Sequence, residues 1–267
     1  MSAPYMRSLA RPVPSATVLV LRDGRRGLEV LMIERARSIE FAGGATAFPG
    51  GKVTRGDRDP ALWRYLARRR GVTRPLLARQ AAAIREVFEE TGLLLLRAAE
   101  GGRLLGEARR AALARRWRHG LEANQAELIA ILRCHGLRID PALLVPFAHW
   151  ITPPVSPKRF DTSFFLARLP HGQMAAHDGW EAVRAQWLCP HDALRAHEAG
   201  KLPMMFPTRL NMMRLSRAHS VADALAQARR QPVITVEPVL FHEDGRLKAR
   251  IPKSAGYGGQ GVFDRVF

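Results

Sequence analysis

Three carboxylates lie close together in the segment from Arg85 to Leu93, at Glu86, Glu89 and Glu90. Residues three and four positions apart share one face of a helix, so a helix here would bring the three side chains together. Like charges at that spacing destabilise a helix by about 0.2–0.5 kcal/mol per pair. A divalent cation would reverse that effect, and hard oxygen donors suit Mg²⁺ or Mn²⁺. The segment therefore predicts either a metal site or a solvated acidic helix face.

A glycine-rich segment precedes these carboxylates in the chain. Phe48, Pro49, Gly50 and Gly51 follow one another, and Pro and Gly together interrupt a regular helix or strand. Glycine also lets the backbone approach a ligand closely. An acid, Asp57, comes six positions after Gly51. We expect this segment to turn tightly.

Together these residues resemble the signature of the Nudix hydrolase superfamily. The matching positions are Gly51, Asp57, Arg85, Glu86, Val87, Glu89, Glu90, Gly92 and Leu93. The chain departs from the signature in two ways. The upstream acid is Asp57 where the signature has Glu, and Gly51 and Arg85 are 34 positions apart where the signature gives 14. The intervening insertion affects the placement of Asp57 more than that of the helix.

A second segment narrows the resemblance to one branch of the superfamily. Residues 31–36 with Gly44 and the turn at 48–51 resemble the motif that precedes the signature in coenzyme A diphosphatases. Glu40 stands where that motif has a second Arg. Further similarity, to the peroxisomal acyl-coenzyme A diphosphatases of animals and their bacterial relatives, lies in residues 83–97, 149–153 and 159–166.

The resemblance implies hydrolysis of a pyrophosphate linkage by attack of water on phosphorus, assisted by Mg²⁺ or Mn²⁺. Glu86, Glu89 and Glu90 would hold the metal ions, and Glu89 or Glu90 would also act as general base. Arg85 would orient the carboxylates by bidentate pairing. The implied substrate is coenzyme A or an acyl-coenzyme A, cut to 3′,5′-ADP and (acyl-)phosphopantetheine. Two alternatives stay open: another substrate, namely ADP-ribose, NADH or a nucleoside triphosphate, and a Nudix module that binds a ligand without turnover.

Five residues are candidates for substrate contacts: Arg35, Gly50, Gly51, Arg159 and Asp161. The two glycines would bring backbone carbonyls near the metal, or merely form a turn. The last two residues precede an apolar strand, where they either contact the substrate or pair with each other. Glu181, just before another predicted strand, is a further candidate for a metal ligand or base.

Strands and one long helix must position these residues. Two β-rich runs, 16–22 and 28–34, flank Asp23-Gly24, which predicts a hairpin. Thr73-Arg74-Pro75 suits the start of the helix that carries the carboxylates, and Gly92 suits its end in a left-handed conformation. Further helices are expected at 62–69, 104–117, 122–132, 192–198, 207–217 and 221–229, and strands at 143–151, 162–169, 183–188, 233–241 and 247–251.

The implied fold class is α/β: a Nudix α/β/α sandwich with a mixed β-sheet, helical insertions and a C-terminal extension. We expect a Nudix domain over residues 1–200, with insertions near 58–75 and 98–140. Residues 201–267 would form a helical and hairpin extension packed on the same domain. The glycines after residue 255 predict a flexible tail, and an ordered tail over the active site is the alternative.

The formal net charge is +18, and far more of the positive residues are arginine than lysine. A basic balance is typical of nucleic-acid binding. Arginine and alanine are spread along the whole chain, however, as in a GC-rich bacterial genome, and a coenzyme A type substrate is polyanionic too. We therefore expect a small nucleoside diphosphate partner rather than nucleic acid. The arginines at 109, 110, 115, 116 and 118 predict a solvated helix or a phosphate-binding surface.

The two cysteines, Cys134 and Cys189, have no metal or redox spacing. No apolar stretch reaches transmembrane length, and the N-terminus lacks an apolar run of signal length. We therefore expect a cytoplasmic bacterial protein without a membrane partner, and the sequence leaves a homodimer open.

Overall fold

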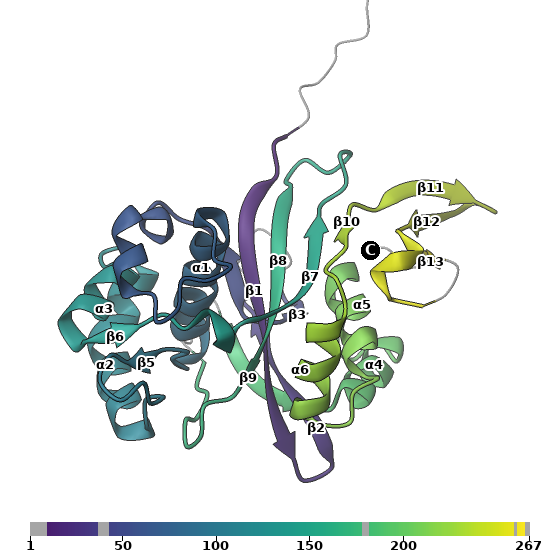
Figure 1. Cartoon of the computed structure of the whole chain (residues 1–267). Coiled ribbons are helices and arrows are strands. Elements are labelled where there is room, and N and C mark those ends of the chain that lie inside the picture. Colours follow the sequence, from purple (N-terminus) through teal and green to yellow (C-terminus); the bar gives the residue numbers. More distant parts are fainter. Residues whose placement is uncertain (1–9, 37–42, 178–181, 259–260, 265–267) are drawn as a thin grey trace, which may run out of the picture.

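The computed structural model describes residues 10–36, 43–177, 182–258 and 261–264. In this part of the chain, eight strands form a mixed sheet in the order β10-β7-β8-β1-β2-β3, with β4 paired to β1 and β9 to β2 (Figure 1). Strand β8 runs parallel to β1, while β2 and β4 run antiparallel to it. The strands are β1 (Val13–Gly24), β2 (Gly27–Arg35), β3 (Thr46–Ala47), β4 (Gly50–Lys52), β7 (Val145–Ile151), β8 (Phe160–Arg168), β9 (Ala182–Leu188) and β10 (Thr235–Val236). The α/β fold class is confirmed.

Strand β1 is the centre of the sheet because both of its faces are apolar. Successive side chains of a strand point to opposite faces. Val18 and Val20 accordingly join one hydrophobic core, and Leu19 and Leu21 join the other. The predicted hairpin is confirmed, although Asp23 and Gly24 belong to β1 and the turn comes two residues later.

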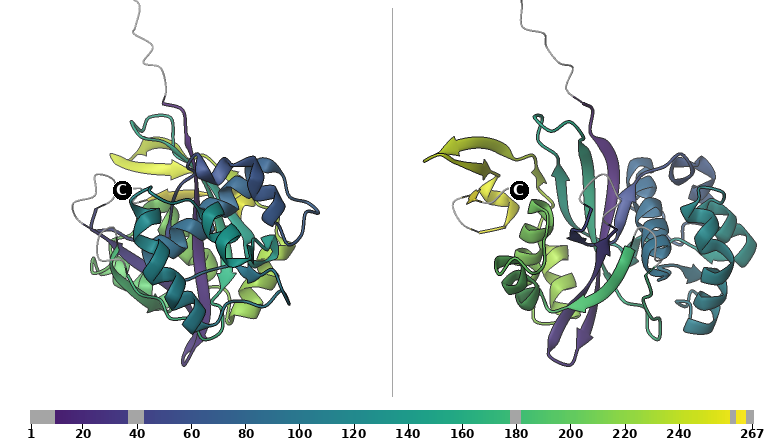
Figure 2. Two further views of the ribbon diagram at one scale, coloured as in Figure 1. Left: turned by 90° about the vertical axis from the view of Figure 1, so that its left-hand side faces the viewer. Right: turned by 180° about the vertical axis from the view of Figure 1, so that it is seen from behind.

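Helices cover both faces of the sheet (Figures 1 and 2). The first core is shared with α1 (Arg74–Thr91), α2 (Glu107–Glu122) and α3 (Leu128–His135). The second core is filled by α4 (Pro190–Glu198), α5 (Phe206–Leu215), α6 (Val221–Arg230) and parts of the C-terminal segment. The predicted sandwich, with a mixed sheet between helices, is therefore confirmed.

The helix that carries the carboxylates, α1, begins and ends where the sequence predicts. Thr73 caps it by accepting a hydrogen bond from the N–H of Leu76, and a proline lies in the first turn. Gly92 ends it with φ 69°, and its N–H donates to the carbonyl of Phe88. Three carboxylates are thereby carried on one rigid element.

The helix expected at 62–69 is wrong in type and length. The structure has short 3-10 helices at Gly56–Arg58 (η1) and Pro60–Tyr65 (η2), and the chain then leaves the helical path. The reason is that the backbone of this segment pairs with Ile139 instead of continuing a helix. Ile139 donates its N–H to the carbonyl of Tyr65, and its carbonyl accepts from the N–H of Ala67. A short two-stranded sheet, β5 (Arg97–Ala98) with β6 (Leu137–Arg138), was also not predicted.

The C-terminal glycines do not make the described part of the tail flexible. Strands β11 (Val239–Glu243), β12 (Arg246–Arg250) and β13 (Val262–Asp264) form an antiparallel sheet, and Lys253–Ala255 form the 3-10 helix η4. Tyr257 is buried, accepts a hydrogen bond from Trp150 Nε1 and donates one to Asn211 Oδ1. This buried tyrosine anchors the tail to β7 and α5, so the expected flexible tail is wrong for the described residues. Among those residues, no helix is long and apolar enough to cross a membrane.

Candidate active site

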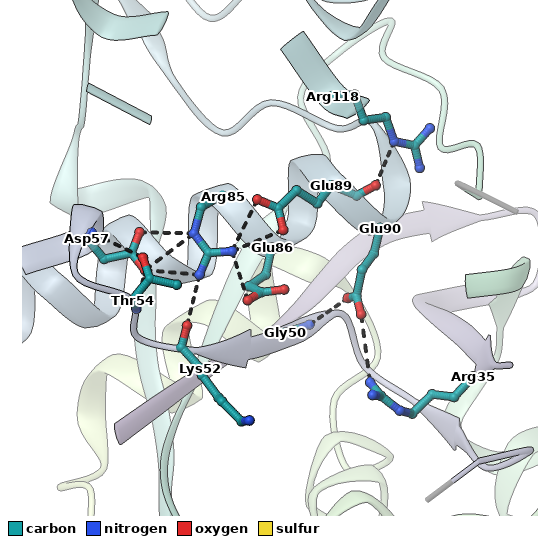
Figure 3. A network of polar contacts seen from close by, with 10 residues as sticks. All are labelled: Arg35, Gly50, Lys52, Thr54, Asp57, Arg85, Glu86, Glu89, Glu90 and Arg118. Atoms are coloured by element: carbon teal, nitrogen blue, oxygen red, sulfur yellow. Dashed lines mark hydrogen bonds and ion pairs between the residues drawn. The ribbon is translucent and has the colours of Figure 1, made fainter. Parts of the chain in front are cut away.

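The guanidinium of Arg85 lies at the centre of a buried carboxylate cluster (Figure 3). Its Nη1 lies 2.9 Å from Glu86 Oε1 and donates to both oxygens of Glu89 at 3.0 and 3.1 Å. Its Nε donates to Asp57 at 3.1 Å, and its Nη2 donates to Asp57 and to the carbonyl of Lys52. All five guanidinium hydrogens thus face acceptors, which is the geometry of a clamp.

Opposing effects act on the pKa values of the side chains in this cluster. Burial alone would lower the pKa of the Arg85 guanidinium, but the negative charges of Glu86, Asp57 and Glu89 raise it. Burial, together with the charge of Glu86, raises the pKa of Glu89 to about 8 even though Arg85 pulls it down. One arginine therefore does not compensate all the carboxylates that surround it, and a further cation would stabilise their charged forms.

This raised pKa gives a prediction for pH dependence. Between about 4.5 and 8, folded Glu89 holds a proton that the unfolded chain has released, so the free energy of unfolding without metal should fall as pH rises. A cation displaces that proton, so metal affinity should rise by up to roughly tenfold per pH unit in the same window. Isothermal titration with Mn²⁺ at several pH values measures this slope. An equally steep slope in Glu89→Gln would assign it to another group.

The glycine pair lies against the ends of two carboxylates. The N–H of Gly50 donates to Glu90 Oε2 at 2.8 Å, and Arg35 Nη1 lies 3.8 Å from the other oxygen of Glu90. A methyl group at Gly51 would lie 2.3 Å from Glu86 Oε1. Gly50 makes this contact through its N–H, whereas the resemblance implied a role for backbone carbonyls. Because residue 51 has no side chain, the Glu86 carboxylate can occupy the space beside it.

The two glycines should respond differently to alanine. In Gly51→Ala the obstacle is the flexible end of Glu86, so we expect a stable protein whose turnover falls about tenfold or more as that carboxylate is displaced. In Gly50→Ala the new methyl would lie 2.4 Å from the Ala16 carbonyl in β1, so stability should fall. Melting temperatures and kcat of both variants test this contrast. Equal melting temperatures would contradict it.

The donor set fits a divalent metal in its chemistry, although the described residues contain no group of three side chains already arranged as metal ligands. Arg85 Nη1 lies between Glu86 and Glu89. The carboxylates of Glu86, Glu89 and Glu90 are hard oxygen donors, and Gly51 keeps room for one of them. These three residues would hold the ion, and the Nε side of the guanidinium binds Asp57.

Arg159 and Asp161 do not pair with each other, so that alternative is wrong. Arg159 donates to the carbonyls of Thr152 and Ala10 and to Glu237. Asp161 accepts from Arg79 Nη2 at 2.5 Å, and its other oxygen lies 2.5 Å from His149 Nε2. None of these contacts involves the carboxylates of α1. Their role in substrate binding stays a prediction. Glu181, the further candidate for a metal ligand or base, lies outside the described residues, as does Glu40, which stands where the motif has Arg.

The arginine cluster of α2 divides into two groups. Arg115 and Arg116 are exposed, as a solvated helix predicts. Arg110 is buried and donates to the carbonyl of Gly92, and Arg118 donates to the carbonyl of Glu89 at 2.6 Å. Neither alternative from the sequence anticipated this second group. Asp57 was also left out of the predicted site, although its place in the signature was the signal that could have found it.

Three comparisons with known proteins agree with this geometry. A family model described as the NUDT19 Nudix domain matches residues 76–215, which is more than half of the chain. The chain is 25% identical to the acyl-coenzyme A diphosphatase NUDT19 of Xenopus laevis over 227 residues, covering 70% of this chain and 59% of that protein. It is also 25% identical to the Gallus gallus protein of the same name over 242 residues, covering 73% and 63%. The chain thus spans less than two thirds of the length of either relative.

A solved structure resembles most of the chain. The crystal structure of a Nudix hydrolase from Alicyclobacillus acidocaldarius is 29% identical, covers 82% of this chain and 97% of its own, and superposes with a TM-score of 0.66. The matched region of the family model contains α1 from Leu76 onward, with its three carboxylates. The fold, the glycine turn beside α1 and the family match lead to one conclusion: this chain belongs to the Nudix hydrolases, in the family of the NUDT19 Nudix domain.

Proposed function

We propose that the protein is a pyrophosphohydrolase that depends on Mg²⁺ or Mn²⁺ and cleaves coenzyme A or an acyl-coenzyme A to 3′,5′-ADP and (acyl-)phosphopantetheine. The observation that carries the proposal is the set of three glutamates near the end of α1. Glu86 and Glu89 lie beside the Arg85 guanidinium, and Glu90 accepts from the N–H of Gly50. A module that only binds its ligand has no chemical need for such a costly group of buried carboxylates.

The residues of the chain have separate roles in this proposal. A divalent ion bound by Glu86, Glu89 and Glu90 would neutralise the diphosphate and make a bound water more acidic. Arg85 orients the glutamates by holding Glu86 and Glu89 from one side and Asp57 from the other. Glu89 or Glu90 accepts the proton of the attacking water.

The substrate class follows from Arg35 and from the relatives. Arg35 comes from the end of β2 and lies beside Glu90, with its side chain 19% exposed. Its Nε is buried and has no hydrogen-bond partner among the residues that the structure describes. A cation in that position suits an anionic phosphate group next to the metal ligands. The two vertebrate relatives are named acyl-coenzyme A diphosphatases, which favours coenzyme A species over other nucleoside diphosphates.

The test is incubation of the purified protein with Mg²⁺ or Mn²⁺ and a panel of coenzyme A, acyl-coenzyme A, ADP-ribose, NADH and deoxynucleoside triphosphates, with products identified by mass spectrometry. Release of 3′,5′-ADP with the highest kcat/KM supports the proposal. Preference for another diphosphate would keep the chemistry and reject the substrate. Binding without cleavage of any member would favour a ligand-binding module.

A further inference from the structure

We propose that Arg118, which lies outside the Nudix signature in α2, is a positioning residue for Glu89. It holds the last turn of α1 where the glutamates have to act. This inference rests on the proposed function, because it assigns Glu89 a place in metal binding. It concerns the helix backbone, whereas the contacts of Arg85 concern the carboxylates themselves.

The last carbonyls of an α-helix have no partner within the helix. At the end of α1, the carbonyls of Glu89, Thr91 and Gly92 accept from donors in other parts of the chain. Arg118 Nε donates to the carbonyl of Glu89 at 2.6 Å (Figure 3). The remaining donors are the N–H of Ala176 to Thr91 at 2.9 Å and Arg110 Nη1 to Gly92 at 3.0 Å. The turn that carries Glu89 and Glu90 is therefore fixed by tertiary contacts.

Arg118 also ties a second segment to this turn. Its Nη2 donates to the carbonyl of Ala176 at 2.8 Å, and the N–H of Ala176 returns to the helix at Thr91. One guanidinium thus joins α2, the end of α1 and the segment that contains Ala176. The planar fork of arginine can hold two carbonyls in a fixed relation, which the single ammonium of lysine does less well.

Arg110 is less well placed for the same role. Two of its nitrogens donate to Glu107 at 2.9 and 2.5 Å, and its third contact is with Gly92, beyond the last glutamate. Arg118, in contrast, contacts the carbonyl of Glu89 itself. Because that contact is with the backbone, its effect on Glu89 is on position. A cation at the C-terminal end of the helix also complements the helix dipole.

Loss of this contact should weaken metal binding and slow the reaction while substrate binding is kept. A misplacement of about 1 Å in a catalytic constellation can cost up to roughly a hundredfold in rate. For Arg118→Met we expect kcat to fall about tenfold or more and the Kd for Mn²⁺ to rise several-fold, with KM for the substrate within about twofold of wild type. Arg118→Lys, which can still donate to one carbonyl, should be intermediate.

The experiment compares wild type, Arg118→Met, Arg118→Lys and Arg115→Met. Arg115 is an exposed arginine of the same helix, so its variant controls for loss of charge and should match wild type. The measurements are kcat and KM under saturating metal, the Kd for Mn²⁺ by isothermal titration, and the melting temperature. A lower melting temperature with unchanged kcat and unchanged Kd in Arg118→Met would show a merely structural role and overturn the proposal.

The same set of variants also decides two further outcomes. If Arg118→Met does not fold, Arg118→Lys carries the test, and wild-type kcat and Kd in that variant would reject the role. If wild type cleaves no member of the substrate panel, the proposed function fails. The Kd for Mn²⁺ in the variants then still decides whether Arg118 positions the carboxylates.

Discussion

Replacing Glu89 by Gln is expected to lower kcat about 10²- to 10⁴-fold while the protein stays folded. The amide keeps the size of the side chain and can still accept from Arg85, but it has no charge for a metal and accepts no proton. Because ionised Glu89 is disfavoured by burial, the metal-free variant should be as stable as wild type or more stable at neutral pH. Turnover at saturating metal and urea denaturation in EDTA measure both effects.

A matched control and a second site variant complete this prediction. Glu243→Gln removes a charge from the exposed ion pair with Lys248 in the C-terminal hairpin and should leave kcat unchanged. Glu90→Gln should lose activity comparably, because Glu90 is held between the N–H of Gly50 and Arg35. Unaltered turnover in both Glu89→Gln and Glu90→Gln would remove the metal-carboxylate interpretation.

Arg85→Met should have the largest effect on stability. It leaves the buried Asp57 and Glu89 without the cation that binds both, and breaking a buried pair on one side typically costs roughly 3–5 kcal/mol of unfolding free energy. Mn²⁺ should restore part of this loss, because it can replace the guanidinium at Glu86 and Glu89. Asp57 would stay unpaired, so recovery should be incomplete. Urea denaturation with EDTA and with Mn²⁺ measures the two quantities.

The control for Arg85→Met is a variant that breaks an exposed ion pair. In Arg195→Met the lost partner is Asp192, and the arginine side chain is 71% exposed, so the loss should be below about 1 kcal/mol. If Arg85→Met were no less stable than Arg195→Met, the guanidinium would not be the central counter-charge of the cluster. Full recovery by Mn²⁺ would instead show that Asp57 does not depend on Arg85.

Local patterns in the sequence were enough for the helix that carries the glutamates. Thr73, the following proline and Gly92 act within one or two turns of their own positions, so the ends of α1 could be predicted without knowledge of the rest of the chain. The β-rich runs of β1 and β2 likewise depend on neighbours in the same strand. The Nudix resemblance placed three glutamates and Arg85 in one site for the same reason.

Contacts between distant segments could not be predicted from local sequence patterns. Asp57 reaches Arg85 across the insertion because η1 packs against α1, and the helix expected at 62–69 gives way to a backbone pairing with Ile139. Arg159 and Asp161 are two residues apart, yet Glu237 and Arg79 bind them separately. Residues two positions apart on a strand point to the same face, so local spacing would allow these two side chains to pair. Only the packing of other elements decides which partner each one meets.

Arg118 shows most clearly the difference between what local sequence predicts and what tertiary contacts decide. As a residue in a run of arginines it could only be predicted to face solvent or phosphate, since both interpretations use the charge alone. Its observed partners are two backbone carbonyls, of Glu89 and Ala176, which become acceptors only because α1 ends beside α2. The types of the candidate catalytic side chains can be predicted from the sequence, while their positions depend on contacts that exist only after the chain has folded.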